Sequence, residues 1–466
     1  MRLSHDWERG VAAFDDANLV SCAGLVPVME LAEQTGLSRM LDEHVWFTSE
    51  RVRSGAANPT PKLTSIIAGL AAGADSIDDL DVIRAGGTKR LFTSVYAPTT
   101  LGTLLREFTG GHVGQLQAVL RRHLLALADR TGVLAGIAER AFVDIDSLLR
   151  PVYGHGKQGA SFGHTKIAGK QVLRKGLSPL VTAISTATAA PVISGIRLRA
   201  GRAGSGRGAG SMVTEAINTA KAAGAANILV RGDAAYGTAA VVGAAVRAKV
   251  GFSVVLTKNA SVNRAIDTIP EDAWVPVRYP GAVKDPDTGE WISDAEVAEV
   301  TYTAFAGTPQ AVTGRLIVRR VRDRNIGPED EMFPVWRYHP FFTNSSESAP
   351  QADITHRRHA VIETLFADLI DGPFAHMPSG LFAANSAWVV LAAITHNLLR
   401  AAGAMAGQAM ARGATLRRQL VNVPARFVRP QGRPTLRLPA HWPHTKPWNK
   451  LWHNVFTRTA TVQVAA

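Results

Sequence analysis

Two aspartates inside an apolar segment constrain the fold of this chain most strongly. In AFVDIDSLLRPVYG (residues 141–154), Asp144 and Asp146 stand two positions apart among apolar side chains that predict a short buried strand. Successive side chains of a strand point to opposite faces, so both carboxylates point the same way. Two like charges side by side at the edge of a core cost free energy unless something positive meets them. The sequence therefore predicts a positive group at this strand.

Composition limits the class of protein. The chain has 466 residues, of which 46% are hydrophobic and 19% charged, as is typical of a globular protein with two or three domains. Its single cysteine, Cys22, excludes an intramolecular disulfide and a cysteine-based zinc finger, and suits a reducing cytosol. The first ten residues lack the pattern of a signal peptide. The most apolar run, residues 381–399, contains Asn385, His396 and Asn397, so we expect a buried helix there and no membrane span.

Positive charge is segregated along the chain, and the formal net charge is +13. No acidic residue lies between Asp146 and Glu215, where ten Lys or Arg occur, or after Asp371. Eleven Lys or Arg follow Asp371, from Arg400 to Arg458, together with Trp442, Trp448 and Trp452. A basic surface that only keeps the protein soluble would explain one such block. Two acid-free blocks with interleaved aromatic residues favour binding to a polyanion, namely nucleic acid.

The pattern of apolar residues divides the chain into five parts. Residues 1–135 are predicted to be helical and 136–260 to follow the order β-β-β-α-β-α-β, which fits a mixed sheet flanked by helices. Residues 261–350 are predicted to be rich in strands, 351–405 to be helical, and 406–466 to form a basic tail. Within the first part, ELAEQTGLSRMLDEHV resembles a helix-turn-helix, although an ordinary helical hairpin explains it as well.

Two segments carry more specific predictions. We expect KIAGKQVLRKGLSPLVTAIST (166–186) to form a single strand, because it is β-branched and bounded by turn residues. We expect DITHRRHAVIETLFADLI (353–370) to form a single helix whose apolar residues recur every three or four positions.

Acidic residues stand out at three places in this order of elements. Asp144 and Asp146 lie on the first strand, Asp233 follows the fourth strand in VRGDAAYG, and Glu363 lies beside the apolar stripe of the late helix. The first and fourth strands can be neighbours in such a sheet. Converging carboxylates bind Mg²⁺ or Mn²⁺, and two such ions activate an oxygen nucleophile for phosphodiester displacement. Each acid alone is as well explained as a turn, cap or solvated residue.

Longer stretches of the sequence carry a resemblance to a known family. They are APTTLGTLLREFTGGHVGQL (97–116), FVDIDSLLRPVYGHGKQGASFGHTK (142–166), ILVRGDAAYG (228–237), HRRHAVIETLFADLIDGPFAHMPSGLFAANSAWVVLAAITHNLLRAAG (356–403) and VPARFVRPQGRPTLRLPAHWP (423–443). In combination they resemble the DDE-class transposases of bacterial insertion sequences, most closely the insertion-sequence 1380 family.

The resemblance implies a fold and an activity. The fold class is α/β, with an RNase H-like mixed-sheet catalytic core, a β-rich insertion between the second aspartate and the glutamate, and a helical N-terminal domain before the core. The implied activity is metal-dependent cleavage and strand transfer at the ends of a mobile element by a cut-and-paste mechanism, with two Mg²⁺ ions that Mn²⁺ can replace. The implied partners are double-stranded DNA, as terminal inverted repeats and target, and a second copy of the chain. No membrane is implied, and the expected location is the bacterial cytoplasm, at the nucleoid.

Carried over to this sequence, the resemblance assigns the catalytic and metal-binding acids. Asp233 and Glu363 are the second and third members of the triad. Asp146 is the first, with Asp144 as the close alternative. The family places a Thr two positions after the first acid, where this chain has Leu148.

The residues around Glu363 also depart from the family pattern. Related transposases carry an aromatic residue seven positions before the glutamate, an Arg four before it and a Lys seven after it, where this chain has His356, His359 and Ile370. Arg357 and Arg358 are candidates for the missing phosphate contact. We predict DNA contacts for six side chains: Lys157, Lys166, Lys170, Arg357, Arg358 and His359.

Two other activities remain open from the sequence. The departures at Leu148 and Ile370 suit an inactive descendant that only binds DNA, and the acids alone suit a metal-dependent nuclease without strand transfer. Trp291 and Trp336 in the β-rich part are either core residues or platforms for an unpaired base.

Overall fold

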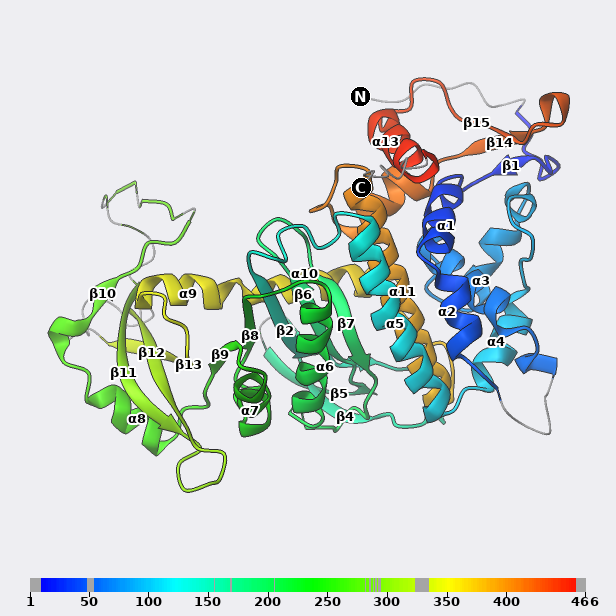
Figure 1. The fold of residues 1–466 in the computed structure, drawn as a ribbon. Helices are drawn as coiled ribbons and strands as arrows, with labels where there is room; N and C mark the ends of the chain where they lie inside the picture. The colour runs from blue at the N-terminus through cyan, green and yellow to red at the C-terminus, as the bar shows by residue number, and fades with distance from the viewer. Residues whose placement is uncertain are drawn as a thin grey trace, which may run out of the picture.

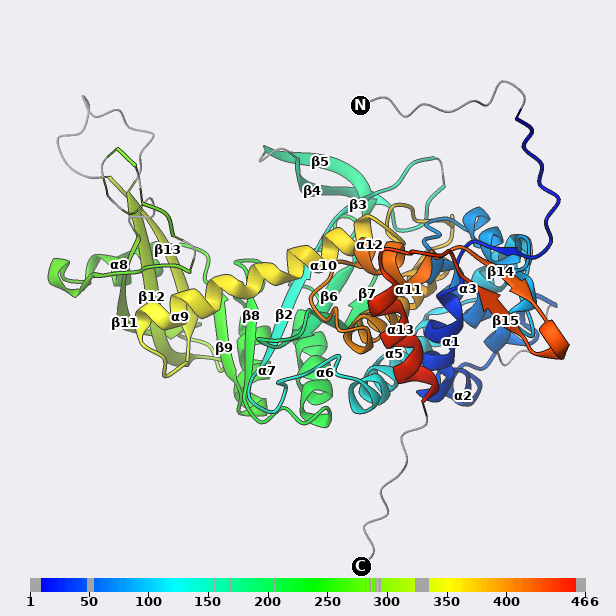
Figure 2. The same cartoon turned by 90° about the horizontal axis from the view of Figure 1, so that it is seen from above.

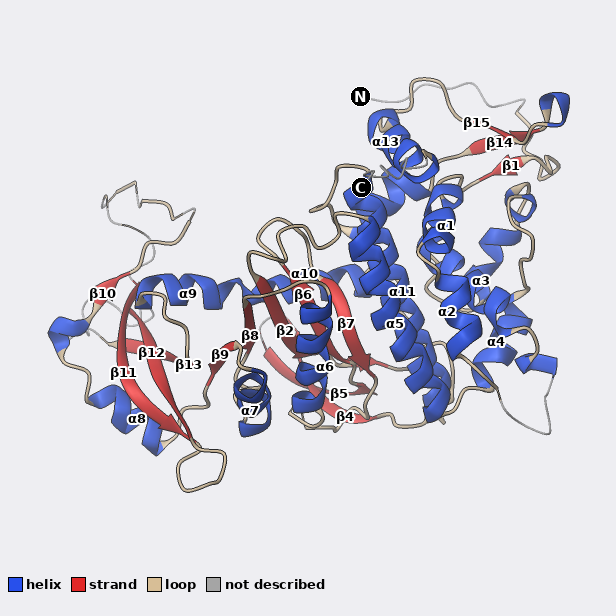
Figure 3. Ribbon diagram, in the orientation of Figure 1, coloured by secondary structure: helices blue, strands red, loops and turns tan. Residues whose placement is uncertain are grey.

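The computed structural model describes residues 10–47, 54–154, 156–167, 170–204, 206–280, 282–284, 286–287, 289, 291, 295–322 and 335–457. The molecule is elongated: a large sheet with its covering helices forms one part, and a group of helices forms the other (Figures 1 and 3).

Nine strands form one mixed sheet in the order β10-β11-β12-β13-β9-β8-β2-β6-β7. Strand β8 runs parallel to its neighbours β2 and β9, and the other neighbouring pairs are antiparallel. The strands are Ala141–Ser147 (β2), Leu180–Ser185 (β6), Val192–Arg197 (β7), Ile228–Gly232 (β8), Gly251–Val255 (β9), Val275–Pro276 (β10), Ala295–Ala304 (β11), Val312–Arg322 (β12) and Trp336–Thr343 (β13). The predicted mixed sheet is therefore confirmed, and the strands predicted within 261–350 extend it beyond β9.

Helices cover both faces of this sheet (Figures 1 and 2). Helices α6 (Ala209–Ala222) and α7 (Ala239–Ala248) lie on one face, and α9 (Ala349–Arg357) and α10 (Val361–Ile370) cross the other. The inward face of α6 repeats apolar residues at helical spacing, and all six residues of β6 are buried. The middle of the sheet is thus covered on both sides, so its strands are nearly continuous in apolar residues. The short helix α8 (Ala260–Asp267) precedes the strands of the outer part.

The other part of the molecule packs five N-terminal helices around a helix from far along the chain. The N-terminal helices are Leu25–Gln34 (α1), Leu37–His44 (α2), Pro59–Ala72 (α3), Pro98–Arg106 (α4) and Gly110–Arg130 (α5). Helices α1, α3, α4 and α5 pack against α11 (Phe382–Met405), which also packs on strand β7, and all share one apolar core with the sheet. The division of the chain at residue 135 therefore stays a prediction.

Helix α11 is the buried helix expected at 381–399. It is the single described helix long and apolar enough to cross a membrane, and 89% of its most apolar window is buried within the protein, as in a core helix. The amide of its Asn397 accepts a hydrogen bond from Ile193 N and donates one to Ile193 O, both at 2.8 Å. The polar residue therefore satisfies the backbone of edge strand β7 instead of remaining unpaired in the core.

The C-terminal region folds back onto the N-terminal helices. Strand β14 (Ala425–Val428) pairs with β1 (Leu19–Val20) and β15 (Thr435–Arg437), and helix α13 (Thr445–Phe456) packs on α1 and α11. The remaining elements are helix Gly413–Leu416 (α12), a π-helical turn Arg417–Val421 and 3₁₀ turns at Ser54–Ala56, Asp78–Arg84, Thr88–Arg90, Glu271–Ala273, Arg358–Ala360 and Pro430–Gly432.

The prediction of one strand over 166–186 is wrong. Its first part belongs to a small sheet of β3 (Arg150–Pro151), β5 (Lys170–Leu177) and β4 (Ser161–Ile167), which projects from the molecule in Figure 2, and its second part is β6 of the large sheet. The chain changes sheets at Ser178 and Pro179, where proline offers no N–H for a ladder. Within the small sheet, Gly176 permits the close approach of β3, because a Cβ there would lie 2.4 Å from Arg150 O.

The single helix predicted for 353–370 is also wrong in detail. It begins earlier, at Ala349, and a 3₁₀ turn at Arg358–Ala360 separates α9 from α10. The His359 Nδ1 atom lies 2.8 Å from the His356 carbonyl oxygen, which can only accept, so a side chain occupies an acceptor that a continuous helix would use. The break re-aims the following helix, which carries Glu363.

Candidate active site

Two acids leave neighbouring parallel strands side by side. Ile145 of β2 is paired with Gly232 of β8, so Asp146 and Asp233 are the next residue on each strand. The prediction that these two strands are neighbours is confirmed. Asp146 is half-buried and Asp233 is exposed. The carboxyl ends of parallel strands in open α/β sheets are where binding sites usually form.

Asp146 experiences the charges of the other predicted acids. Its pKa is raised to about 7, first by burial and then by the negative charges of Asp233, Glu363 and Asp144. A hydrogen bond from Ser147 N to Asp146 Oδ1 at 2.6 Å opposes this shift. Burial lowers the pKa of the nearby Arg199 and the charge of Asp146 opposes that shift, but at Asp146 burial and the neighbouring acids outweigh this attraction. The site thus accumulates negative charge.

Glu363 comes to this site from a helix that lies much later in the sequence than Asp146 and Asp233. It lies in the first turn of α10, where Ile362, Leu365, Phe366 and Leu369 form the buried stripe and Glu363 is exposed. Helix α10 packs on β2, and the glutamate charge contributes to the raised pKa of Asp146. The charges of Asp233 and Glu363 therefore both act on Asp146 at the end of β2.

Asp144 has a different environment from Asp146. Its two carboxylate oxygens accept hydrogen bonds from Arg231 Nε and Nη2, both at 2.8 Å, and both side chains are 1% exposed. Arg231 also donates to Thr355 O at 2.9 Å and lies 4.1 Å from the centre of the Phe142 ring. We expected metal ions to be the positive group at this strand, but at Asp144 the positive group is an arginine. Arg231 was not predicted as a functional residue, although it stands two residues before Asp233.

The loop after Asp233 is held in place by short contacts. Asp233 Oδ1 accepts a hydrogen bond from Ala235 N at 2.9 Å, so the aspartate shapes its own turn. The Tyr236 hydroxyl donates to Ser147 Oγ at 2.8 Å and ties this loop to the end of β2. Burial raises the pKa of Tyr236 above its usual range, so the phenol stays neutral. These contacts fix the relative positions of the strand ends that carry Asp146 and Asp233.

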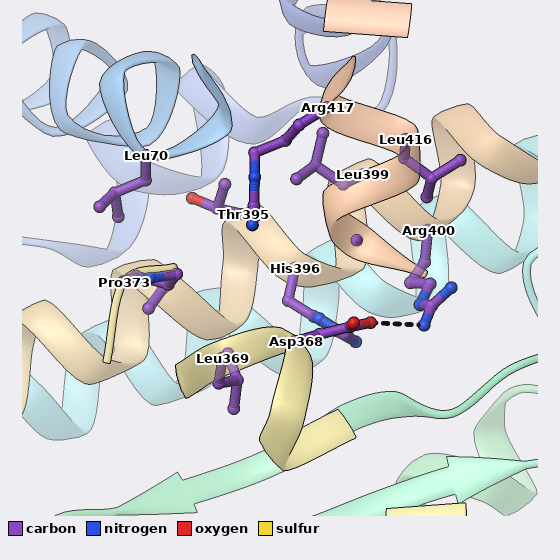
Figure 4. A pocket seen from close by; sticks show the side chains of 12 residues that line it. Leu70, Asp368, Leu369, Pro373, Thr395, His396, Leu399, Arg400, Leu416 and Arg417 are labelled. Atoms are coloured by element: carbon purple, nitrogen blue, oxygen red, sulfur yellow. Dashed lines mark hydrogen bonds and ion pairs between the residues drawn. The ribbon is translucent and has the colours of Figure 1, made fainter. Parts of the chain in front are cut away.

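The far end of α10 is anchored by a second buried acid, Asp368 (Figure 4). Its carboxylate accepts from Arg400 Nη2 of α11 at 2.9 Å and from Arg412 Nε at 2.5 Å. His396 of α11 lies beside them, and burial together with the Arg400 charge lowers its pKa to about 4. Asp368 was not predicted from the sequence either. The sequence did contain a signal for it: an acid at a buried helix position, followed by a segment with arginines and no acids, indicates a buried ion pair.

The predicted DNA-contacting residues divide into three groups. Lys157 Nζ donates to Met377 O at 2.9 Å and to Ser379 O at 3.1 Å, so it fastens its loop within the chain. Arg357 and Arg358 are exposed, and His359 is half-buried, with the contact to His356 described above. The side chains of Lys166 and Lys170 lie outside the described residues. Contact of these residues with DNA stays a prediction.

The tryptophans of the outer strands have intramolecular partners. The Trp336 ring lies 4.3 Å from the guanidinium carbon of Arg320, whose other side faces Trp274 at 4.4 Å. Trp291 lies 5.5 Å from both Arg278 and Lys284. The structure therefore gives Trp336 a packing role.

The donor set of the acidic site suits a divalent metal. Carboxylates are the oxygen ligands that Mg²⁺ and Mn²⁺ prefer, and a cation would neutralise the negative charge that Asp233 and Glu363 add at Asp146. Within the described residues, no three acidic, histidine or cysteine side chains stand close enough to enclose an ion already. The chemistry of the residues fits the metal, and binding would require their side chains to close on it.

The fold and site define a class: a mixed α/β protein with carboxylates at the ends of its central parallel strands. The family described as Transposase DDE domain group 1 matches residues 7–459, so the chain belongs to this family. Among solved structures the chain is similar to the piggyBac transposase synaptic complex with hairpin DNA, at 12% identity and a TM-score of 0.41, over 87% of this chain and 77% of that chain. No curated protein sequence matched the chain. The family supports a DNA-transposing enzyme.

Proposed function

We propose that this protein is a DNA transposase whose Asp146, Asp233 and Glu363 bind two Mg²⁺ ions and catalyse cleavage and strand transfer at the ends of an insertion sequence. The observation that carries the proposal is the register of β2 and β8, which sets Asp146 beside Asp233, with α10, the helix of Glu363, packed on β2. The pKa of Asp146, raised to about 7 with contributions from Asp233 and Glu363, agrees with this arrangement. Three acids from β2, from the end of β8 and from α10 thus share one electrostatic environment. Strongly perturbed carboxyl groups that converge from separate elements are typical of catalytic sites.

The strand arrangement supports an RNase H-like core for this enzyme. Three antiparallel strands, β7, β6 and β2, continue into the parallel strands β8 and β9, and the acids lie on the central pair. Strands β10–β13 extend the sheet as the β-rich insertion between Asp233 and Glu363. The helices before β2 would bind element ends or a second copy, in the bacterial cytoplasm.

The residues of the site have separate roles in this proposal. Asp146, Asp233 and Glu363 would hold the ions, which when bound supply the charge that activates an oxygen nucleophile and stabilises the leaving oxygen. Asp146 would have to lose its proton to act as a ligand, because its pKa of about 7 leaves it partly protonated at neutral pH. Asp144 is a positioning residue, since its paired Arg231 fixes the adjacent strands. Tyr236 and Ser147 hold the two strand ends at a constant separation.

The test uses DNA that carries the sequences flanking the gene on both sides. Wild type should nick this DNA in Mg²⁺ or Mn²⁺ and join precleaved ends to a target plasmid. Asp233→Asn and Glu363→Gln should each bind the same DNA and reduce nicking at least ~10³-fold, because removing a ligand removes the metal-activated nucleophile. The matched control Asp267→Asn removes an exposed carboxylate at the end of α8 and should nick normally.

Other results would select the alternative activities. Retained nicking by Asp233→Asn or Glu363→Gln contradicts the assignment of these residues. Nicking without joined products indicates a nuclease. Absence of cleavage by wild type in Mn²⁺, with DNA binding intact, indicates an inactive DNA-binding descendant, as the departures at Leu148 and Ile370 suggested.

A further inference from the structure

A groove of about 560 Å³ adjoins the acidic site on the side of the outer strands. It is bordered by the loop after β9, by strands β12 and β13, and by the end of α9. Ala234, the residue after Asp233, lines it, so the groove opens next to one of the proposed metal ligands. A molecule in this groove would therefore lie beside the reaction centre.

Positive side chains from three separate elements line this groove. Lys258 follows β9, Arg319 lies on β12 and Arg357 ends α9. Asp353 is the one acidic residue among the described residues that line it, and the Tyr279 hydroxyl donates to its Oδ2 at 2.5 Å. The excess of positive charge acts on the neighbouring His339, whose pKa is lowered by burial and by the charges of Arg319, Lys258 and Arg357. Three cations around one carboxylate form a receptor with unused capacity for an anion.

Arg319 and Arg320 are adjacent on β12 but have different partners, and Arg320 is paired with carboxylates. Arg320 donates from Nε to Glu296 at 2.6 Å and from Nη1 and Nη2 to Glu271 at 2.9 and 2.6 Å, and it lies between two indole rings. Arg319 points to the opposite face, toward Tyr279 and the groove. Its Nε atom is buried and has no hydrogen-bond partner among the described residues. A buried N–H without an acceptor is unfavourable, and an oxygen of a bound anion would remove that cost.

The size of the groove limits what the anion can belong to. Pockets of this volume hold small molecules, so one or two nucleotides fit and a duplex does not. Apolar residues of the wall, Val255, Leu256 and Phe341, suit a base or sugar more than free water. We propose that the groove binds a phosphodiester of an unpaired DNA strand through Lys258, Arg319 and Arg357, and so guides that strand to or from the acidic site. This inference rests on the proposed function, since it names the form of DNA that the site handles.

The test measures binding of a fluorescent single-stranded oligonucleotide, and of the same sequence as a duplex, without divalent metal. Arg319→Met and Lys258→Met should each weaken single-strand binding several-fold and reduce the slope of log K against log salt by about 0.7. Duplex binding should change less. The matched control Arg247→Met removes an exposed arginine on α7, which covers the other face of the sheet, and should leave the single-strand slope unchanged. Thermal unfolding of each variant verifies that the chain is folded.

Three outcomes would overturn the inference. Unchanged single-strand binding by a folded Arg319→Met variant shows that the groove does not contact the strand. Equal losses for single strand and duplex show a general DNA-binding surface. If inorganic phosphate raises the melting temperature of wild type but not of Arg319→Met, while oligonucleotide binding is equal, the groove is a site for free phosphate. Because metal is absent, these results are independent of the nicking assay, which alone tests the acidic triad.

Discussion

The two ends of helix α10 carry acids in opposite electrostatic environments. Glu363 in the first turn adds negative charge to a site where the pKa of Asp146 is already raised by burial and by Asp233. Asp368 in the last turns is enclosed by Arg400 and Arg412, at 2.9 and 2.5 Å. One helix therefore holds an acid whose charge is fully matched and, little more than a turn away, an acid among like charges.

This difference distinguishes acids that stabilise the fold from acids that form the candidate active site. A buried carboxylate matched by arginines fixes the elements that contribute them, and it is costly to break. Acids gathered without a matching cation cost stability, and such costs are concentrated at functional sites. The same distinction holds along β2, where Asp144 is paired with the buried Arg231 and Asp146 experiences the negative charges of Asp233 and Glu363.

The largest expected effect on stability is at Asp368, the acid of α10 that is paired with arginines. Asp368→Asn should lower the free energy of unfolding by about 3–5 kcal/mol, because it leaves Arg400 buried without its counter-charge. Urea unfolding monitored by tryptophan fluorescence measures this loss. The double variant Asp368→Leu/Arg400→Met should lose less than the sum of its single changes, since it removes both buried charges. A loss under ~1 kcal/mol for Asp368→Asn would mean that the pair does not anchor α10.

The matched end should also be sensitive to acid through His396. Its pKa of about 4 in the fold lies below the ordinary value of about 6.5, so the unfolded chain binds a proton first. The contribution of this histidine to stability is full above pH 6.5 and is lost as the pH falls toward 4, up to about 3 kcal/mol. His396→Gln should flatten this part of the stability curve between pH 7 and 4. The control His164→Gln, on an exposed position of β4, should leave the curve as in wild type, and an unchanged curve for His396→Gln would contradict the prediction.

At the acidic site near the Glu363 end of α10, the stability of the fold should depend on pH in the opposite direction. The pKa of Asp146 is raised to about 7, so its contribution to stability is full below about 4 and is lost as the pH rises through 7. In metal-free protein, Asp146→Asn should therefore stabilise the fold by about 2 kcal/mol at pH 8 and have little effect at pH 4. Asp144→Asn is the matched control on the same strand and should destabilise the fold at pH 8, because it breaks the pair with Arg231. Destabilisation by both substitutions at pH 8 would remove the contrast between these acids.

The smallest effect on stability is expected at Glu363 itself. Its side chain is exposed, so Glu363→Gln should change the free energy of unfolding by no more than about 0.5 kcal/mol. The same variant should lose metal-dependent nicking, which separates activity from stability on one helix. Equilibrium unfolding and the nicking assay on a single preparation make this comparison. A loss of stability similar to that of Asp368→Asn would indicate that Glu363 is structural.

Much of the sheet and the candidate acids could be predicted from sequence because their signals are local. Apolar runs bounded by turn residues marked β2, β8 and β9, and acids at strand ends marked Asp146 and Asp233. The order of elements then placed these two acids next to each other. Glu363 became a candidate because it lies beside the apolar stripe of a late helix, and its role stays a prediction.

The partners of the buried acids could not be predicted, because they depend on contacts between distant segments. Asp144 pairs with an arginine 87 positions away, and Asp368 with arginines 32 and 44 positions away. One sequence contains no record of such pairings. The change of sheets at Pro179 and the turn at Arg358–Ala360 were missed for a related reason, since propensity favoured continuous elements and tertiary contacts decided otherwise.

The position of α11 within the N-terminal helices has a consequence for how the protein is made. Helices α1–α5 leave the ribosome early, yet their shared core needs α11, and β1 waits for β14 more than 400 residues later. Chains emerge at about 5–20 residues per second, so the early helices spend tens of seconds without their central partner. An enzyme that cuts DNA is thereby assembled only when translation is nearly finished, and an interrupted product would be left without a folded scaffold.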